Sequence, residues 1–210
     1  MASKRSEPSY SVEEYLAMER ASEDRHEYID GYIFAMAGES IEHSRICVNL
    51  SRTLSTQLLG KRCEVLSPNM KVRSGSILNT RKTAKGLFSY PDAVVICGEP
   101  EFHDPHRDVL INPMVIIEVL SESTESFDRG VKLLRYRTHN PTLTDYLLVS
   151  QSSPWIDHFH KDANGEWIYS SILGLDNSLN IASIDCTLRL AEVYDRVVFP
   201  PEEDEEQNED

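Results

Sequence analysis

Two nearly continuous apolar runs constrain the fold more than any other feature of the sequence. They span residues 93–97 and 115–120, and runs of this length and composition are typical of strands that are covered on both faces. A third apolar run covers residues 146–149, and helical spacing of apolar residues is found between the second and third runs, over residues 126–139. Strands with a helix packed between them predict a mixed sheet with helices on its faces, of the α/β (α+β) class.

Further elements flank this centre. Ser11 is in the position of an N-cap for a short helix, and the Asp30-Gly31 pair between two apolar runs (27–34) predicts a β-hairpin. The remaining predicted elements are a helix over 43–59 that Gly60 ends, a strand over 63–72, a second hairpin of 155–160 and 167–172 joined by 162–165, and a short closing segment over 188–194.

The length and composition indicate one globular domain. The chain has 210 residues, 40% of them hydrophobic, which fits one domain over residues 10–199 with disordered ends at 1–9 and 200–210. No run approaches a membrane span or the apolar core of a signal peptide. The four scattered cysteines (Cys47, Cys63, Cys97 and Cys186) suggest free buried thiols in a reducing compartment, so we expect a cytoplasmic protein.

The charge is distributed unevenly. Seven acids and no base lie between Pro200 and Asp210, which is half of the net charge of −14. Residues 65–91 have the opposite composition, with no acid and five bases, and could be either a phosphate-contacting loop or a solubilising one. These candidate nucleic-acid-binding residues are Lys71, Arg73, Arg81, Lys82 and Lys85.

Two carboxylates are placed where a hard cation could be held. Asp92 begins one apolar strand, and Glu118 interrupts the most apolar strand of the chain. A carboxylate there is unfavourable unless it is paired or bound to metal. Two such ligands beside a cation suit Mg²⁺ or Mn²⁺ and the cleavage of phosphodiesters. The simpler interpretations are a salt bridge to a structural Arg or a position on a solvated edge for Glu118, and a turn cap for Asp92.

Lys132 is the candidate third member of this group. With helical spacing, Asp128, Lys132, Arg135 and Tyr136 lie on the side opposite Phe127, Val131 and Leu134. From there Lys132 could orient or help to deprotonate an attacking water, or stabilise phosphate charge. Alternatively, Lys132 is only an exposed i,i+4 partner of Asp128.

The residues around these candidates resemble a known family. The segments 90–95, 112–125 and 128–136, with the 27–31 hairpin, the helix that begins at His43 and the 146–150 strand, are similar to the Uma-two family of restriction-endonuclease-like proteins in the PD-(D/E)XK nuclease superfamily. The resemblance covers about residues 10–199.

The resemblance implies a restriction-endonuclease-like core with β-hairpin additions. It implies Asp92 and Glu118 as ligands of Mg²⁺ (with Mn²⁺ as a substitute), Glu27 as a third carboxylate, and Lys132 as the catalytic lysine. Leu120 occupies the place of the usual superfamily lysine, and Asn69 stands where many relatives have Asp. DNA is the implied substrate, and we expect a homodimer because cutting a duplex needs two sites.

Other functions remain open. The acidic composition and the displaced lysine also fit a nuclease-fold protein that binds nucleic acid or a protein partner without cutting, and a small phosphoester is a third possible substrate. The pairs His103/His106 and His158/His160 have metal-like spacing. The second pair would share one face of a hairpin, but both pairs lack the further ligands of a zinc site.

Overall fold

The computed structural model describes residues 10–36, 38–75 and 86–201. The helices are α1 (Val12–Ala21), α2 (Ile41–Leu58), α3 (Glu125–Phe127), a π-helical turn η1 (Asp128–Lys132), α4 (Leu133–His139), a 3₁₀ turn η2 (Ala182–Ile184) and α5 (Leu190–Val193). The strands are β1 (His26–Ile29), β2 (Tyr32–Ala35), β3 (Cys63–Leu66), β4 (Lys71–Ser74), β5 (Leu87–Ser89), β6 (Ala93–Cys97), β7 (Val109–Leu110), β8 (Val115–Val119), β9 (Asp145–Val149), β10 (Trp155–Lys161), β11 (Trp167–Leu173), β12 (Ser178–Ile181) and β13 (Cys186–Arg189).

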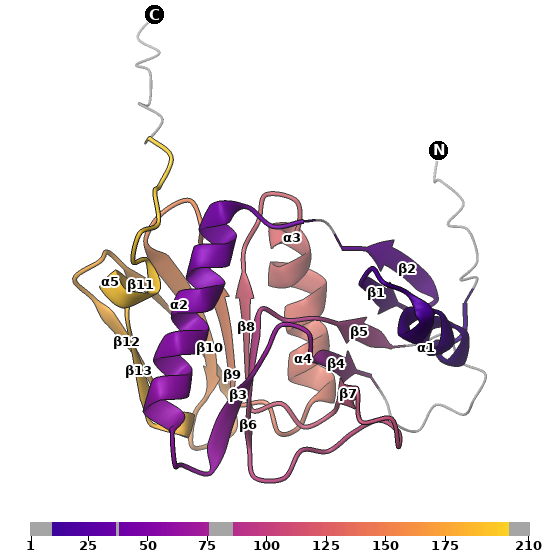
Figure 1. Cartoon of the computed structure of the whole chain (residues 1–210). Helices are drawn as coiled ribbons and strands as arrows, with labels where there is room; N and C mark the ends of the chain where they lie inside the picture. Colours follow the sequence, from indigo (N-terminus) through magenta and orange to yellow (C-terminus); the bar gives the residue numbers. More distant parts are fainter. Residues whose placement is uncertain (1–9, 37, 76–85, 202–210) are drawn as a thin grey trace, which may run out of the picture.

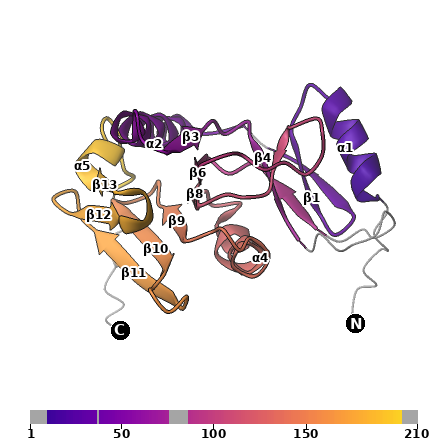
Figure 2. The ribbon, with the colours of Figure 1, turned by 90° about the horizontal axis from the view of Figure 1, so that it is seen from below.

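A six-stranded mixed sheet forms the centre of the molecule, in the order β11-β10-β9-β8-β6-β3. Only β8 and β9 pair in parallel within it. The helix α2 covers one face and α4 covers the other, as the view from below shows (Figure 2). The predicted α/β (α+β) class, with a mixed sheet between helices, is therefore confirmed.

The residues of β8 explain why both faces are covered. Successive side chains of a strand point to opposite faces. Val115 and Ile117 pack with the α2 side, whereas Ile116 packs with Leu133 and other residues on the α4 side. Because both faces are buried, the strand is apolar at every position except Glu118. This alternation places Glu118 on the face that α4 covers.

A second sheet, in the order β2-β1-β5-β4-β7, lies beside the large one and carries α1 (Figure 1). Its small core contains Tyr15 and Leu16 of α1 packed on Tyr28 and Phe88. Ser11 caps α1, as the sequence predicts, and the structure adds a reciprocal capping box with Glu14. The Asp30-Gly31 hairpin is also confirmed, and both residues have the positive φ that its turn requires (48° and 96°).

One predicted strand proved to be two. Residues 63–72 were expected to form a single strand, but β3 pairs with β6 in the large sheet, and β4 pairs with β5 and β7 in the small sheet. The chain changes sheets in the turn between them, where Met70 N–H donates to the carbonyl of Ser67. This segment therefore connects the two sheets.

Two of the four cysteines are not free. Cys63 and Cys97 are cross-strand neighbours on β3 and β6 and form a disulfide, whereas Cys47 and Cys186 are free and buried. The expectation of four free thiols is wrong for the first pair, because residues 34 positions apart become adjacent only when the sheet forms. The cytoplasmic location inferred partly from free thiols stays a prediction.

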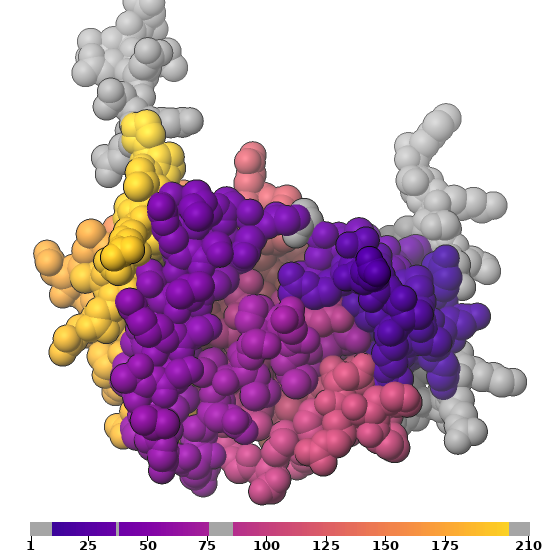
Figure 3. Space-filling view, in the orientation of Figure 1, coloured from indigo at the N-terminus to yellow at the C-terminus, as the bar shows by residue number. Residues whose placement is uncertain are grey.

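Helix α2 forms much of one face of the molecule, next to the N-terminal elements (Figure 3). It is capped by Ser40, and Gly60 follows it with φ of 74°.

Among the described residues, no helix is both long and apolar enough to cross a membrane. The predicted ends at 1–9 and 200–210 lie almost entirely outside the described residues.

Candidate active site

Asp92 and Glu118 lie beside each other on neighbouring strands. The antiparallel register pairs Ala93 with Ile117, and one further step along it brings Asp92 opposite Glu118. Side chains at opposite positions of an antiparallel pair project from the same face. One carboxylate oxygen of Asp92 accepts the backbone N–H of Val119 at 2.7 Å, which fixes the carboxylate at the end of the sheet.

The side chain of Lys132 gathers three carboxylates from separate elements. Its Nζ lies 3.1 Å from Glu27 Oε1 on β1, 3.2 Å from Glu118 Oε1 on β8 and 2.9 Å from Asp128 Oδ1 on its own π-turn. Glu118, Asp128 and Lys132 are only 3%, 2% and 5% exposed. The residues proposed from the sequence, including Glu27, therefore come together, although their positions span more than half of the chain. We call Glu27, Glu118, Asp128 and Lys132 the buried quartet.

The orientation of the helical segment 125–139 places Lys132 inside. Lys132 and Tyr136 are buried, whereas Val131 and Leu134 on the other side are 42% and 68% exposed. The alternative of an exposed Lys132–Asp128 pair is therefore wrong, because the same i,i+4 pair faces the sheet. The apolar spacing did not identify the inward side, since two of the carboxylates that compensate Lys132, Glu27 and Glu118, are distant in sequence.

The π-turn between α3 and α4 is itself anchored. Leu133 N–H, at its end, donates to the carbonyl of Asp128, and the buried hydroxyl of Tyr146 donates to the same carbonyl at 3.0 Å. Single π-turns inside helices are frequent at functional sites. This one holds Asp128 and Lys132 in contact with the sheet.

The quartet carries more negative charge than its lysine can balance. Burial alone would lower the pKa of Lys132, but the carboxylates of Glu118, Glu27 and Asp128 raise it well above its ordinary value. Burial, together with the charges of Asp128, Asp92 and Glu27, raises the pKa of Glu118 well above its ordinary value despite the nearby ammonium. Three carboxylates thus contact one ammonium, and Asp92 adds a fourth negative charge near Glu118.

Two carboxylate oxygens of the quartet are left without regular hydrogen bonds. Glu118 Oε1 and Asp128 Oδ1 are buried and face the ammonium, but within the described part of the chain neither accepts a hydrogen bond of good geometry. Such groups are unfavourable unless another partner is present. A cluster of hard oxygen donors with excess negative charge fits a divalent cation such as Mg²⁺.

A second group adjoins Asp92 on the α2 side, which the sequence did not indicate as part of the site. His43 Nε2 lies 2.9 Å from Asp92 Oδ1 and 3.8 Å from Glu39 Oε2. Burial would lower the pKa of His43, but the hydrogen bond and charge of Asp92 raise it. Burial raises the pKa of the Cys47 thiol, and the carboxylates of Asp92 and Glu39 raise it further. The E-x₃-H-x₃-C spacing was the signal available in the sequence.

The proposed phosphate contacts of Lys71 and Arg73 need correction. Lys71 is 3% exposed, with its ammonium over the rings of Tyr15 and Tyr90, and Arg73 is 8% exposed and donates to His103 Nδ1 at 2.8 Å. A basic segment can contact phosphates only if its side chains reach solvent. The side chains of Lys71 and Arg73 instead pack against Tyr15, Tyr90 and His103. The other three candidates, Arg81, Lys82 and Lys85, lie outside the described residues.

The two histidine pairs have protein partners. His158 Nε2 is 2.7 Å from Asp145 Oδ1, and the rings of His158 and His160 stack 4.8 Å apart, so this pair shares one face as expected. In the first pair, His103 accepts from Arg73, and His106 lies 3.3 Å from Asp104.

Comparison with known proteins agrees with this fold. A crystal structure described as "a putative nuclease belonging to DUF820 from Anabaena variabilis" superposes with a TM-score of 0.71 at 15% identity, over 90% of this chain and 99% of that one. Two uncharacterized proteins of Synechocystis sp. are similar in sequence. One is 37% identical over 192 residues (91% of this chain, 95% of that protein), and the other is 33% identical over 161 residues (77% and 86%).

The model of one family matches residues 12–191, which include every member of the buried quartet and both groups around Asp92. That family is described as "Putative restriction endonuclease". The match spans the six-stranded and five-stranded sheets and the helices that cover them, and the superposed DUF820 structure has the same fold. The chain therefore belongs to the Uma2 family and has its nuclease-like fold.

Proposed function

We propose that this protein is a Mg²⁺-dependent endonuclease that hydrolyses phosphodiester bonds in DNA, with Asp92 and Glu118 as metal ligands. The observation that carries the proposal is the buried quartet beside Asp92, in which three carboxylates surround one ammonium and Asp92 adds a fourth negative charge near Glu118. Membership of a family described as restriction endonucleases supports the class of reaction. Mn²⁺ should substitute for Mg²⁺, because both prefer oxygen ligands.

The side chains of the site have distinct roles in this proposal. Asp92 and Glu118 hold the cation, and Glu27 completes the carboxylate set from the small sheet. When bound, the cation neutralises charge on the scissile phosphate and acidifies a water molecule. Asp128 keeps Lys132 in place through their 2.9 Å ion pair.

The raised pKa of Lys132 distinguishes between its possible roles in catalysis. Its raised pKa keeps the side chain protonated at neutral pH, so it is a poor general base. A protonated lysine instead orients water and stabilises phosphate charge. Of the three roles considered from the sequence, deprotonation of the attacking water is therefore the one not assigned to Lys132.

Substrate approaches from the partly open side of the site. Asp92 and Glu27 are partly exposed, whereas Glu118 and Lys132 are buried. DNA backbone contacts are assigned in this proposal to Arg81, Lys82 and Lys85, and duplex cleavage to a homodimer, with a cytoplasmic location. The acidic tail would reduce non-specific attraction to DNA.

Plasmid cleavage with Mg²⁺ or Mn²⁺ tests the proposal. Glu118→Gln keeps the shape of the side chain but removes a ligand charge, so cleavage should fall at least roughly 100-fold, the upper end for loss of a supporting contact near a metal. Glu122→Gln is the matched control, since Glu122 is an exposed acid four residues away, and it should cut like the wild type.

A thermal shift experiment addresses the rival function. If the quartet binds metal, Mg²⁺ and Mn²⁺ raise the melting temperature of the wild type but not of Glu118→Gln. No cleavage and no shift would instead indicate a nuclease-fold protein that binds its partner without cutting, with Lys132 as the permanent counter-ion of the carboxylates. Turnover of simple diesters without cutting of DNA would indicate a small phosphoester as substrate.

A further inference from the structure

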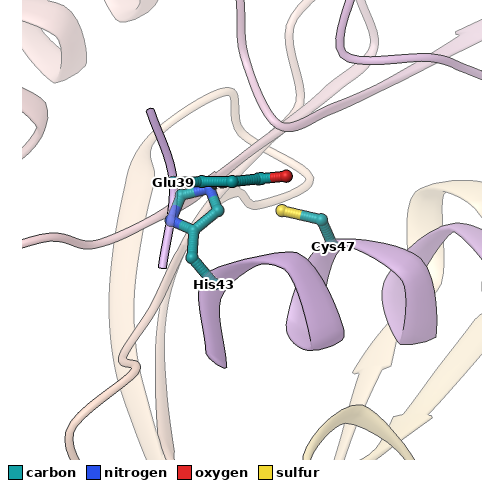
Figure 4. Close-up of side chains that lie close together, drawn as sticks. All are labelled: Glu39, His43 and Cys47. Carbon is teal, nitrogen blue, oxygen red and sulfur yellow. Dashed lines mark ion pairs between the residues drawn. The ribbon is translucent and has the colours of Figure 1, made fainter. Parts of the chain in front are cut away.

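Three potential metal ligands lie on one side of the start of α2. His43 and Cys47 are four residues apart on α2, so the helical repeat places them on one face, and Glu39 lies just before the N-cap Ser40. One ligand atom from each lies within 4.8 Å of the others, and the Glu39 Oε2 to His43 Nε2 distance is 3.8 Å. Figure 4 shows the sulfur of Cys47 directed toward the carboxylate of Glu39, with the His43 ring beside them.

The spacing of these atoms is close to what one cation requires. Bonds of about 2.0 Å to nitrogen and about 2.3 Å to sulfur place the ligands of a tetrahedral zinc ion roughly 3–4 Å apart. The Glu39–His43 pair already lies within this range, and because the three ligand atoms all lie within 4.8 Å of one another, they need to move closer by at most about 1 Å. Glu39 is exposed and precedes the helix, so its side chain is free to make that movement.

The chemistry of this group differs from that of the buried quartet. The quartet offers carboxylate oxygens, which suit Mg²⁺, whereas this group adds an imidazole and a sulfur. A thiolate with an imidazole selects borderline cations of the zinc type over Mg²⁺. The cysteine therefore decides which metal this group would bind.

Asp92 supplies a fourth ligand that is already oriented. Its Oδ1 lies 2.9 Å from His43 Nε2, and its Oδ2 is fixed by the N–H of Val119. A hydrogen bond of this kind on a ligating carboxylate is typical of metal sites. We propose that Glu39, His43, Cys47 and Asp92 form a Zn²⁺-class binding site.

Binding of Zn²⁺ at this site would affect cleavage of DNA, because Asp92 is a ligand in both the proposed Mg²⁺ site and the proposed Zn²⁺ site. This consequence rests on the proposed function. A Zn²⁺ ion on Asp92 and Cys47 withdraws Asp92 from Mg²⁺. Zn²⁺ therefore inhibits cleavage of DNA, and it does so through Cys47. The binding itself does not depend on whether the protein cuts DNA.

Binding is tested with Co²⁺, which occupies zinc sites and absorbs in the near ultraviolet when a thiolate is bound. The full chain titrated with Co²⁺ should develop this thiolate absorption, and Zn²⁺ should remove it. Cys47→Ser should abolish the band and weaken Zn²⁺ binding at least roughly tenfold, the lower limit for contacts that only support a ligand. Cys186→Ser is the matched control, because Cys186 is the other free buried cysteine, and it should keep the band.

Each outcome decides the proposal. No thiolate band in the wild type, or a band that persists in Cys47→Ser, overturns it, as does loss of the band in Cys186→Ser alone. Far-ultraviolet circular dichroism checks that Cys47→Ser is folded. If it is not, His43→Asn is the second variant, and it should lose Zn²⁺ affinity by a similar factor.

The inhibition arm separates this proposal from the nuclease proposal. If the wild type cuts DNA, the Zn²⁺ concentration that halves its cleavage should be at least roughly tenfold lower than for Cys47→Ser, each compared with its own rate in Mg²⁺ alone. Equal inhibition of both would overturn the link to Asp92. If the protein does not cut DNA, the Co²⁺ and Zn²⁺ measurements still stand.

Discussion

At the scale of single residues, the buried charge on Glu118 is unfavourable for the stability of the fold. Its side chain is buried beside Asp128, Asp92 and Glu27, with Lys132 as the neighbouring cation. Removing one partner of a buried ion pair is destabilising when it leaves the other charge unpaired. Lys132 keeps two carboxylate partners, Glu27 and Asp128, when Glu118 is neutralised. The site therefore opposes folding to some degree when no metal is bound.

The pH dependence of the free energy of unfolding should reveal this unfavourable contribution of the Glu118 charge. Because the folded-state pKa of Glu118 is raised, the stability associated with it is fully present below the unfolded pKa of about 4.3 and is lost as pH rises through the folded pKa. Gln cannot ionise, so the advantage of Glu118→Gln over the wild type should grow between about pH 5 and pH 8. Urea unfolding of both proteins in the presence of a chelator measures this difference in the free energy of unfolding at each pH.

The same measurement on Glu122→Gln is the control for this prediction. Glu122 is exposed, so its replacement should change stability by nearly the same small amount at both pH values. An advantage of Glu118→Gln that is constant or shrinks with rising pH would contradict the role assigned to the buried charge.

At the scale of elements, the segment from α3 to α4 decides whether Lys132 can reach the carboxylates. Its π-turn changes the spacing of side chains along the helix, and the Tyr146 hydroxyl holds the carbonyl of Asp128. A regular helix would place residues after Asp128 at a different angle to the sheet. The packing of β9 against this turn is thus part of the site, even though Tyr146 does not touch the carboxylates.

Tyr146→Phe tests the contribution of this hydrogen bond. Loss of one buried hydrogen bond should lower the free energy of unfolding by about 1 kcal/mol and should also weaken Mn²⁺ binding, because the π-turn loses its anchor. Tyr28→Phe is the matched control, since the Tyr28 hydroxyl donates to the Tyr10 carbonyl at the same distance of 3.0 Å in the other sheet. It should lose similar stability and bind Mn²⁺ normally. Equal Mn²⁺ affinities of the two variants would show that the anchor has no role in the site.

At the scale of the whole molecule, the site depends on two sheets staying together. Glu27 comes from the small sheet, whereas Asp92 and Glu118 belong to the large sheet. Arg135 on α4 connects them, because its guanidinium forms an ion pair with Asp30 in the turn next to Glu27. The small sheet is therefore a structural support for one of the carboxylates.

Arg135→Gln should loosen this connection. The pair is partly exposed, so the loss of stability should be about 1 kcal/mol or less. Amide hydrogen exchange should rise in the β1–β2 hairpin, because the turn loses its tie to α4. Arg20→Gln is the control, since Arg20 ties α1 to Asp104 and Asp108 away from the quartet and should affect exchange in α1 instead. Unchanged exchange in the hairpin of Arg135→Gln would contradict the prediction.

The sequence by itself determined the features that depend on near neighbours. The N-cap at Ser11, the positive-φ turn at Asp30-Gly31, and the end of α2 before Gly60 each need only a few adjacent residues, and all were predicted. The covered strands β6 and β8 were also predicted, since burial on both faces requires apolar residues at successive positions. The isolated Glu118 was conspicuous for the same reason.

Only the tertiary structure decided what these elements bring together. The inward orientation of Lys132, the contribution of Asp128, and the position of His43 beside Asp92 depend on contacts between residues far apart in sequence. The pairing of Cys63 with Cys97 and the burial of Lys71 have the same origin. Local spacing fixes which side chains share a face, but the side that turns inward is selected by the charges and cavities that other segments provide.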